Sequence, residues 1–478
     1  MAKRLPPETR DRIIDLLSEG QDRDTIAAML DVTPGQVSAV AAHVTMGTYR
    51  DGPRRSQISP GGRIQAAQPP SDNALFCRIE DSLNAPGETK GPPDSNRRDV
   101  GYASAIVVGE DVNSGELVTW NPRPDSGLAN PHVLILGESG FGKTYATACL
   151  LTELAQQSVP SIVFDYAQGF GLANASPWFV RHAHPAEIHA GKDGIAINPL
   201  QLFPEDVHGP ANVAQRIADT FARVYPKIGV QQHAVLRQAA LEVLNDAGYE
   251  QRTRGTYTTP PPPFRKIQDK LLAYASDPED PNRRFAASVA SHISTIFVFD
   301  TFRPTGQPLD WSGMLGSGGR ASILQLKGLE RSLEQAVTEF LLWNLIGYVE
   351  SLGPGPLRCF VVLDEAHKLS FAVGSPVEKL LREGRKFGLG LLLASQQPED
   401  FSAVAFSNTA TKIVFQVGDE RASVSRQLFR KARNVTSFQE IYEIITKLPR
   451  GTAFFITQNV GRVIRLHSFE ERMTRWSK

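Results

Sequence analysis

The chain has 478 residues, more than one hydrophobic core usually supports, so we expect two or three structural units. Hydrophobic residues make up 41% of it and charged residues 21%, which excludes wholesale disorder, and a formal net charge of +0 gives no whole-chain argument for nucleic acid or an acidic membrane as partner. No apolar run reaches the roughly 18 residues that cross a bilayer, and the three cysteines are widely spaced, so we expect a cytoplasmic protein without membrane insertion.

The first 46 residues have the pattern of a small all-α trihelical domain. Thr33 is placed to cap a third helix that has Pro34 at its first position. Residues 47–100 are rich in Gly, Pro, Ser and Asn, and we expect them to form a flexible linker. Apolar residues mark one face of the first two helices, at Ile13, Leu16 and Leu17 and at Ile26, Ala27 and Leu30.

From about residue 101 the pattern becomes that of an α/β domain, predicted to span 101–470. Apolar runs of strand length alternate with longer helical segments, the arrangement that builds a parallel sheet covered by helices. Strand signals disappear at about 200–300, where we expect an inserted all-helical subdomain, and residues 471–478 are predicted to be a C-terminal tail. The predicted strands are 104–108, 133–136, 161–164, 322–326, 360–363, 389–394, 412–416 and 453–456.

A phosphate-binding loop follows the predicted strand 133–136. Gly137 to Thr144 match the pattern GxxxxGK[ST], and a helix begins there. The glycines let backbone N–H groups converge on phosphate oxygens, and Lys143 would reach the β and γ phosphates of ATP while the Thr144 hydroxyl would ligate Mg²⁺. A glycine-rich loop that matches by chance is the alternative, which the correct order of strand, loop and helix disfavours. The residues expected to bind the nucleotide are Gly137, Glu138, Ser139, Gly140, Phe141, Gly142, Lys143, Thr144 and Tyr145.

An acid pair follows a second buried strand. The apolar run 359–363 ends in Asp364 and Glu365. Asp364 is placed to hold Mg²⁺, and Glu365 to polarise the water that attacks the γ-phosphate. Two acids after a strand also occur at ordinary helix N-termini, but the phosphate-binding loop upstream favours the catalytic interpretation. His367, nearby, is interpreted as a packing or hydrogen-bonding residue.

Polar and basic residues flank the predicted strand 389–394. Gln396 follows it and could sense the γ-phosphate, although an ordinary strand-to-loop transition is the alternative. Arg382, Arg385 and Lys386 precede it as a basic cluster, which could neutralise a phosphate of its own or a neighbouring chain, or form a solvated helix end. Asp165 closes the strand 161–164 and is a further acid whose role the sequence leaves open.

Together these motifs resemble the HerA/FtsK superfamily of hexameric P-loop motor ATPases, nearest to its HerA and conjugation-ATPase branch. The resemblance implies a RecA-like core, a ring of six subunits with ATP between neighbours, and movement of DNA through a central pore. It also makes Gln396 similar to the γ-phosphate sensor and Arg385 a candidate for the arginine that acts across the subunit boundary. The residues that carry it are Asn130–Thr144, Ile197–Leu200, Leu363–His367, Arg382–Gly388, Ala394–Pro398 and Leu448–Gly451, over about residues 100–470.

The chain departs from this family pattern at two places. Gln397 stands where relatives have arginine in the run Ser/Thr-Gln-Arg-Pro. The predicted strand 322–326 offers Gln325 and Lys327 where many relatives have an acid.

Residues 26–37 have the spacing of a helix-turn-helix, with Asp31 in the turn where glycine is common. The third helix would present Gln36, Ser38, Ala39 and His43 outward, and such helices read base edges in the major groove. That helix carries no Lys or Arg, so a protein-docking unit is the alternative to DNA binding.

Three functions are compatible with these motifs. The first is an ATP-driven translocase of duplex DNA. The second is an ATPase that moves protein substrates in a conjugation or secretion machine, and the third is an ATP-gated, DNA-bound platform that recruits a nuclease or other effector. Stimulation of ATP hydrolysis by DNA would separate the first from the second.

Overall fold

The computed structural model describes residues 6–18, 21, 23–33, 36–37, 40, 105–302, 309–396, 401–418 and 422–476. The chain divides into two units, Met1–Arg97 and Arg98–Lys478. In the first unit, α1 (Pro7–Ser18) and α2 (Arg23–Met29) bury a small core that includes Ile13 and Ile26. Most of the predicted third helix, with Ser38, Ala39 and His43, and the predicted linker 47–100 lie outside the described residues.

The second unit is built on one 11-stranded sheet with the order β2-β1-β11-β10-β9-β3-β8-β7-β4-β6-β5. The strands from β9 to β5 in that order are parallel to one another. On the other side of β9 every pairing is antiparallel: β10 pairs with β9, β11 with β10, β1 with β11 and β2 with β1. The strands are β1 (Ile106–Asp111), β2 (Leu117–Trp120), β3 (Val133–Leu136), β4 (Ser161–Asp165), β5 (Ala186–His189), β6 (Ala321–Gln325), β7 (Cys359–Leu363), β8 (Leu389–Ser395), β9 (Thr411–Val414), β10 (Thr452–Thr457) and β11 (Val460–Leu466).

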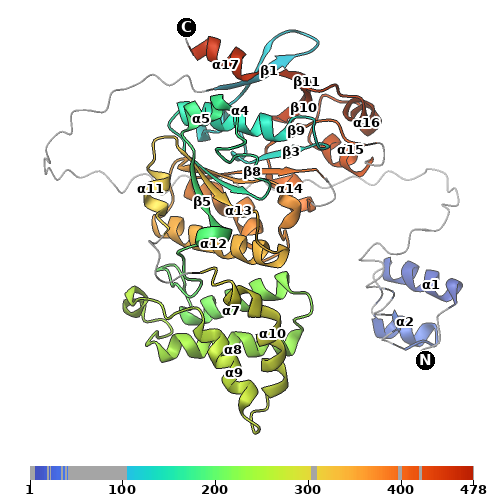
Figure 1. The fold of residues 1–478 in the computed structure, drawn as a ribbon. Coiled ribbons are helices and arrows are strands. Elements are labelled where there is room, and N and C mark those ends of the chain that lie inside the picture. The colour runs from blue at the N-terminus through green and yellow to red at the C-terminus, as the bar shows by residue number, and fades with distance from the viewer. Residues whose placement is uncertain are drawn as a thin grey trace, which may run out of the picture. The chain divides into compact units, whose positions relative to one another are not determined.

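Helices cover both faces of the sheet (Figure 1). The apolar side chains of β3 alternate between two cores: Val133 and Ile135 pack with α4 and α5, and Leu134 and Leu136 with α12 and α13. Central strands buried on both faces must be apolar throughout, which is why β3 and β7 read as continuous apolar runs. The α-helices that accompany the sheet are α4 (Lys143–Gln156), α5 (Pro177–Ala183), α6 (Ala190–Asp193), α11 (Trp311–Leu315), α12 (Arg331–Ser351), α13 (Pro376–Glu383), α14 (Ala403–Asn408), α15 (Ala422–Phe429), α16 (Phe438–Thr446) and α17 (Phe469–Trp476).

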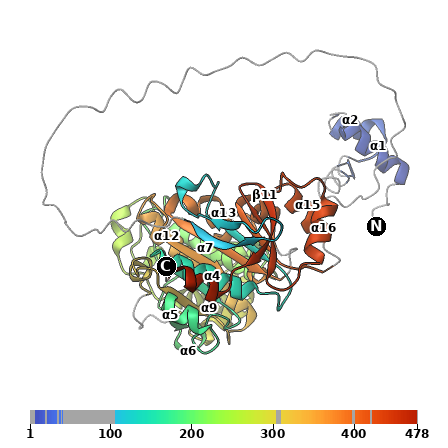
Figure 2. The same ribbon diagram turned by 90° about the horizontal axis from the view of Figure 1, so that it is seen from above.

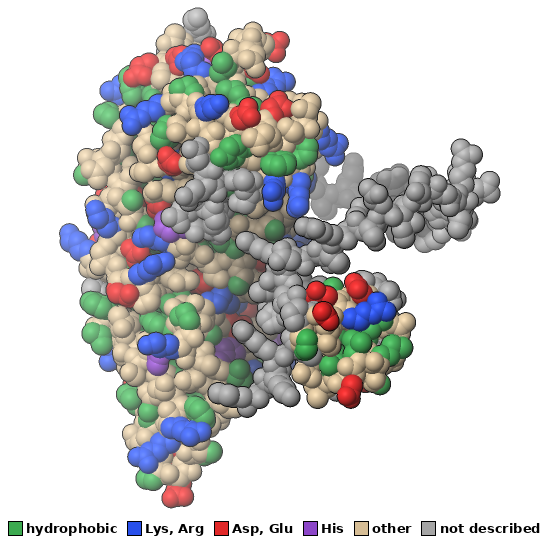
Figure 3. Space-filling view, turned by 90° about the vertical axis from the view of Figure 1, so that its right-hand side faces the viewer, with side chains coloured by type: hydrophobic (Ala, Val, Ile, Leu, Met, Phe, Trp, Pro, Cys, Tyr) green, Lys and Arg blue, Asp and Glu red, His purple; other side chains and the backbone are tan. Residues whose placement is uncertain are grey.

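A helical insert lies beyond α12, away from the sheet (Figure 1). It consists of α7 (Pro210–Val224), α8 (Val230–Asp246), α9 (Lys266–Ser276) and α10 (Arg283–Val298). The rings of Phe221 and Phe264 pack on Phe340 of α12, and Arg223 Nη2 lies 2.7 Å from the buried Glu339 Oε2. The insert is therefore joined to the sheet domain by an apolar contact and a buried ion pair. On the face shown in Figure 3, basic and acidic side chains are interspersed over the described surface.

The α/β prediction is confirmed, and all eight predicted strands are present with ends that differ by at most three residues. The strands β2, β5 and β11 had no prediction. The predicted tail 471–478 differs from the structure, because α17 spans Phe469–Trp476 and Arg472 is 1% exposed. Figures 1 and 2 both place α17 beside α4. Among the described residues, no helix combines the length and the hydropathy needed to cross a membrane.

Candidate nucleotide site

The loop between β3 and α4 has a backbone that only glycine accommodates at its key positions. Gly137 has φ +148°, and a Cβ there would lie 2.5 Å from Phe415 Cβ of the neighbouring segment. Gly142 has φ +109° and immediately precedes α4. The predicted phosphate-binding loop thus has the sharp turn and the helix N-terminus that this function requires.

Lys143 folds back over this loop. Its Nζ donates hydrogen bonds to the carbonyl oxygens of Gly137, at 2.8 Å, and of Glu138, at 2.9 Å. Burial lowers the pKa of Lys143, while the nearby carboxylates of Glu365 and Asp364 oppose that shift. The structure therefore brings together the lysine and the acid pair, which are far apart in the sequence.

The acid pair lies at the carboxyl end of β7. Asp364 is 5% exposed, and burial, followed by the charges of Glu365 and Asp165, raises the pKa of Asp364 to about 7. Glu365 has φ +55°, a left-handed conformation that costs a non-glycine residue about 1 kcal/mol or more and that is concentrated at functional sites. A cation beside Asp364 would relieve this accumulation of negative charge.

Glu365 makes the contact that most directly supports a catalytic constellation. Gln396 Nε2 donates to Glu365 Oε1 at 2.9 Å, because β7 and β8 are adjacent and parallel, with Leu363 paired to Leu393. Glu365 Oε2 lies 3.1 Å from His367 Nδ1, but no hydrogen bond of acceptable geometry reaches this oxygen from any described residue. One carboxylate oxygen is thus held by Gln396, and the other is buried beside His367 without a hydrogen bond of good geometry. Gln397, the departure from the family pattern, lies outside the described residues.

Asp165 has a structural role that the sequence did not reveal. Its carboxylate accepts hydrogen bonds from the backbone N–H groups of Ala167, Gly169 and Phe170 and from Gln325 Nε2. These four bonds fix the loop after β4, which presses against Thr144: a Cβ on Gly169 would lie 3.0 Å from Thr144 Cγ2. Asp165 therefore shapes the wall of the site.

A Mg²⁺ site made of protein groups alone is absent from the described part of the chain, where no three His, Cys, Asp or Glu side chains gather in a metal-binding cluster. The oxygen groups that would hold Mg²⁺ are the Thr144 hydroxyl at the start of α4 and the Asp364 carboxylate after β7. Hard oxygen ligands in this small number fit Mg²⁺, which commonly takes one or two protein ligands and fills its remaining positions with water and substrate phosphates.

Arg385 lies at the amino-terminal ends of the parallel strands, opposite to the end where the phosphate-binding loop lies. It donates to the carbonyl oxygen of Ala129, which precedes β3, whereas the loop follows β3. With Arg123, Arg382 and Lys386 it lines a cavity of about 410 Å³. In a single chain, Arg385 is therefore separated from the phosphate-binding loop by the length of a central strand.

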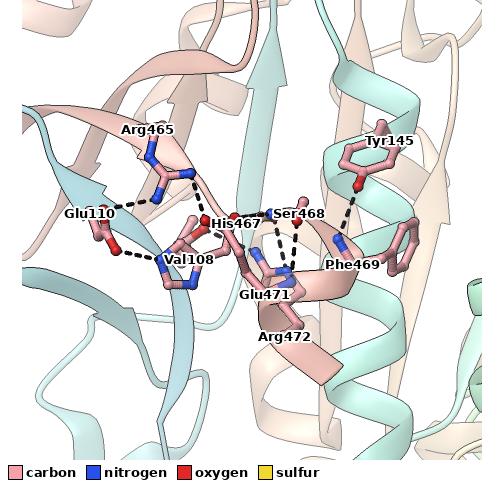
Figure 4. Close-up of polar contacts among 9 residues, drawn as sticks. All are labelled: Val108, Glu110, Tyr145, Arg465, His467, Ser468, Phe469, Glu471 and Arg472. Atoms are coloured by element: carbon pink, nitrogen blue, oxygen red, sulfur yellow. Dashed lines mark hydrogen bonds and ion pairs between the residues drawn. The ribbon is translucent and has the colours of Figure 1, made fainter. Parts of the chain in front are cut away.

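The C-terminal helix contacts the start of α4 (Figure 4). The Tyr145 hydroxyl accepts a hydrogen bond from the Phe469 N–H at 3.0 Å, and the two rings pack edge to face with centroids 5.0 Å apart. Arg472 anchors the helix by donating to the carbonyl oxygens of Val107 and Val108 and to Glu153. No pattern in the sequence predicted this contact between Phe469 and Tyr145.

The segment 448–451, which carried part of the resemblance, also reaches the loop. Arg450 lies with its Cζ 5.9 Å from the centre of the Phe141 ring, and its Nη2 is 3.9 Å from where a Cβ on Gly140 would lie. The motif predicted a family, but not the place of this side chain.

Comparison with known proteins relates this chain to DNA helicases and to a conjugation ATPase. Residues 125–345 match the family model described as "Helicase HerA, central domain". The DNA double-strand break repair helicase HerA of Sulfurisphaera tokodaii is 22% identical over 368 residues, which cover 72% of this chain and 66% of the relative. The protein of that name from Saccharolobus solfataricus is 19% identical, covering 72% and 65%. The chain thus spans about two thirds of the length of these relatives.

A solved structure has the same fold. VirB4 of Thermoanaerobacter pseudethanolicus superposes with a TM-score of 0.63 at 19% identity, covering 77% of this chain and 97% of VirB4. At this identity the likeness concerns the fold: a RecA-like P-loop core that carries a helical insert.

Proposed function

We propose that this chain, which belongs to the HerA and conjugation-ATPase branch of P-loop proteins, hydrolyses ATP and uses the energy to move along duplex DNA. The observation that carries the proposal is that Lys143, Asp364, Glu365 and Gln396 lie together at the carboxyl ends of the central parallel strands. The helicase relatives support DNA as the substrate.

The chain's own residues divide the chemistry among them. The loop N–H groups and Lys143 would bind the β and γ phosphates, so that Lys143 exchanges its two carbonyl partners for phosphate oxygens. Thr144 and Asp364 would hold Mg²⁺, which supplies neutralisation of the phosphate charge when bound. Asp364 would bind in its ionised form, which the cation stabilises against the neighbouring carboxylates.

Glu365 is the proposed general base. Its Oε2 is buried beside His367 and has no good hydrogen bond, so we propose that the attacking water enters next to this oxygen and gives it a proton while Gln396 holds Oε1 in place. A Gln396 amide that turned toward a γ-phosphate would release Oε1, which would make the position of the base depend on the nucleotide state.

Arg385 is proposed to act on the nucleotide of a neighbouring chain. It lies at the amino-terminal ends of the parallel strands, away from the phosphate-binding loop of its own chain. A catalytic role for Arg385 therefore requires an assembly, for which we propose a ring of six subunits. Transition-state charge stabilisation by such an arginine accelerates phosphoryl transfer by about 10³ to 10⁵ in other systems.

The N-terminal unit is proposed to bind DNA and to place the motor on it. Thr33 and Gln36 are joined by reciprocal hydrogen bonds, as expected at the start of the third helix. A nuclease or other effector remains a candidate partner for such an assembly. The competing function, transport of protein substrates, differs in its stimulant and not in its nucleotide chemistry.

The test is steady-state ATP hydrolysis by the full chain, with and without duplex DNA, together with the mass of the assembly. We expect DNA-stimulated turnover by a hexamer, loss of nucleotide binding in Lys143→Ala, and binding without turnover in Glu365→Gln. Turnover that duplex DNA leaves unchanged would favour the protein-moving alternative, and normal turnover by Glu365→Gln would remove that residue as the base.

A further inference from the structure

The topology of the sheet delivers Arg450 to the phosphate-binding loop. Because β10 runs antiparallel to β9, the segment before β10 lies at the carboxyl ends of the parallel strands, where the phosphate-binding loop also lies. The Thr452 N–H donates to the Pro449 carbonyl oxygen at 3.2 Å, and Gly451 has φ +79°, so Pro449 to Thr452 form a turn with Arg450 at its first corner. The turn fixes the backbone that presents this side chain.

The guanidinium lies against the outside of the loop. A Cβ added to Gly140 would lie 3.9 Å from Arg450 Nη2, and Arg450 Cζ lies over the Phe141 ring. The side chain is exposed, and no acidic side chain among the described residues forms an ion pair with it. A cation–π contact at 5.9 Å is weak, so little interaction is lost if the guanidinium turns to another ligand.

Arg450 and the acid pair approach the loop from opposite sides. Asp364 and Glu365 come from β7, beyond β8, whereas Arg450 comes from β10, beyond β9. The acids and Gln396 mark the end of the site where the γ-phosphate is cleaved. A cation on the other side therefore meets the part of the phosphate chain nearer the nucleoside.

We propose that Arg450 binds the α- or β-phosphate of the nucleotide held by its own chain, as a second cation beside Lys143. The inference rests on the proposed function and names a residue that contacts the nucleotide directly. Arginine suits this role because its planar fork binds phosphate oxygens in pairs and stays charged at any physiological pH.

The decisive measurement is the affinity for MgADP, which has the α- and β-phosphates and lacks the γ-phosphate. Binding to the full chain is followed by calorimetry, with no turnover needed. Arg450→Gln is expected to weaken MgADP binding roughly tenfold or more, as for loss of a charge-assisted contact. Arg450→Lys should restore part of the affinity. Arg462→Gln removes another exposed arginine, on β11, and should leave the affinity unchanged.

Three results would separate this inference from the proposed function. Unchanged MgADP affinity in Arg450→Gln overturns the inference, even if a non-hydrolysable ATP analogue binds less well. Lys143→Ala provides the reference: if it also leaves MgADP binding unchanged, the site itself is wrong. Restored binding after mixing Arg450→Gln with Lys143→Ala would mean that Arg450 serves a neighbour, which contradicts binding within its own chain.

Discussion

Lys412 provides a sharp test of the electrostatics of the sheet domain. It lies in β9, between β3 and β10, with 1% of the residue exposed, and its Nζ donates only to the Thr409 carbonyl oxygen among the described residues. Burial, and to a lesser degree the charge of Lys431, lowers the pKa of Lys412 from 10.5 to about 7. The folded protein therefore holds this proton less tightly than the unfolded chain does.

The direction of the pH dependence follows from this difference. Between about pH 7 and pH 10 the unfolded chain binds more protons at this position than the folded protein, so the free energy of unfolding rises with pH. Below pH 7 both states are protonated, and the buried charge costs about 4 to 5 kcal/mol by the usual conversion. Lys412→Met removes that cost but leaves the Thr409 carbonyl without its bond, a loss of about 1 kcal/mol.

Lys412→Met is therefore expected to raise the free energy of unfolding by about 3 kcal/mol at pH 6.5 and by less than about 1 kcal/mol at pH 9.5. Urea denaturation followed by tryptophan fluorescence at the two pH values measures the difference. Lys447→Met replaces an exposed lysine and should change stability by less than about 0.5 kcal/mol at either pH. An equal gain at both pH values would refute the argument, because it would assign the effect to packing instead of charge.

Three other substitutions test the fold around the site. Gly137→Ala should destabilise the protein by about 2 kcal/mol or more, since its Cβ would collide with Phe415; a melting temperature within 1 °C of the unchanged protein would contradict this. Arg472→Met should cost about 3 kcal/mol in urea denaturation because it removes the buried ion pair between Arg472 and Glu153, and Glu153→Gln added to it should recover part of the loss. Gln396→Ala should keep MgATP binding and slow single-turnover hydrolysis about tenfold, whereas an unchanged rate would make Gln396 an ordinary loop residue.

The central strands and the acid pair were predictable from the sequence because their signals are local. A strand buried on both faces must be apolar along its length, and β3 and β7 are. The glycine pattern after β3 follows from a backbone that L-residues cannot adopt, as the contact between Gly137 and Phe415 shows. In these places the chemistry of a few consecutive residues determines the conformation.

The edge strands and the C-terminal helix could not be predicted in this way. β5 is four residues long and partly exposed throughout, so it has neither an apolar run nor an alternation. In α17, a basic residue is completely buried: Arg472 is accommodated because Glu153 and two strand carbonyls, more than 300 residues earlier, accept its hydrogen bonds. No local pattern contains the position of those acceptors.

The candidate site divides along the same line. Lys143 and Thr144 are found by motif, and Asp364 and Glu365 by their place after a strand. The roles of Arg385 and Arg450 depend on whether each side chain lies at the amino-terminal or at the carboxyl ends of the parallel strands. Arg385 precedes a parallel strand and lies away from the loop, whereas Arg450 precedes an antiparallel strand and lies beside it. Both are arginines just before a strand of one sheet, so only strand direction, which the sequence did not reveal for β10, separates an arginine that lies beside the phosphate-binding loop of its own chain from one that does not.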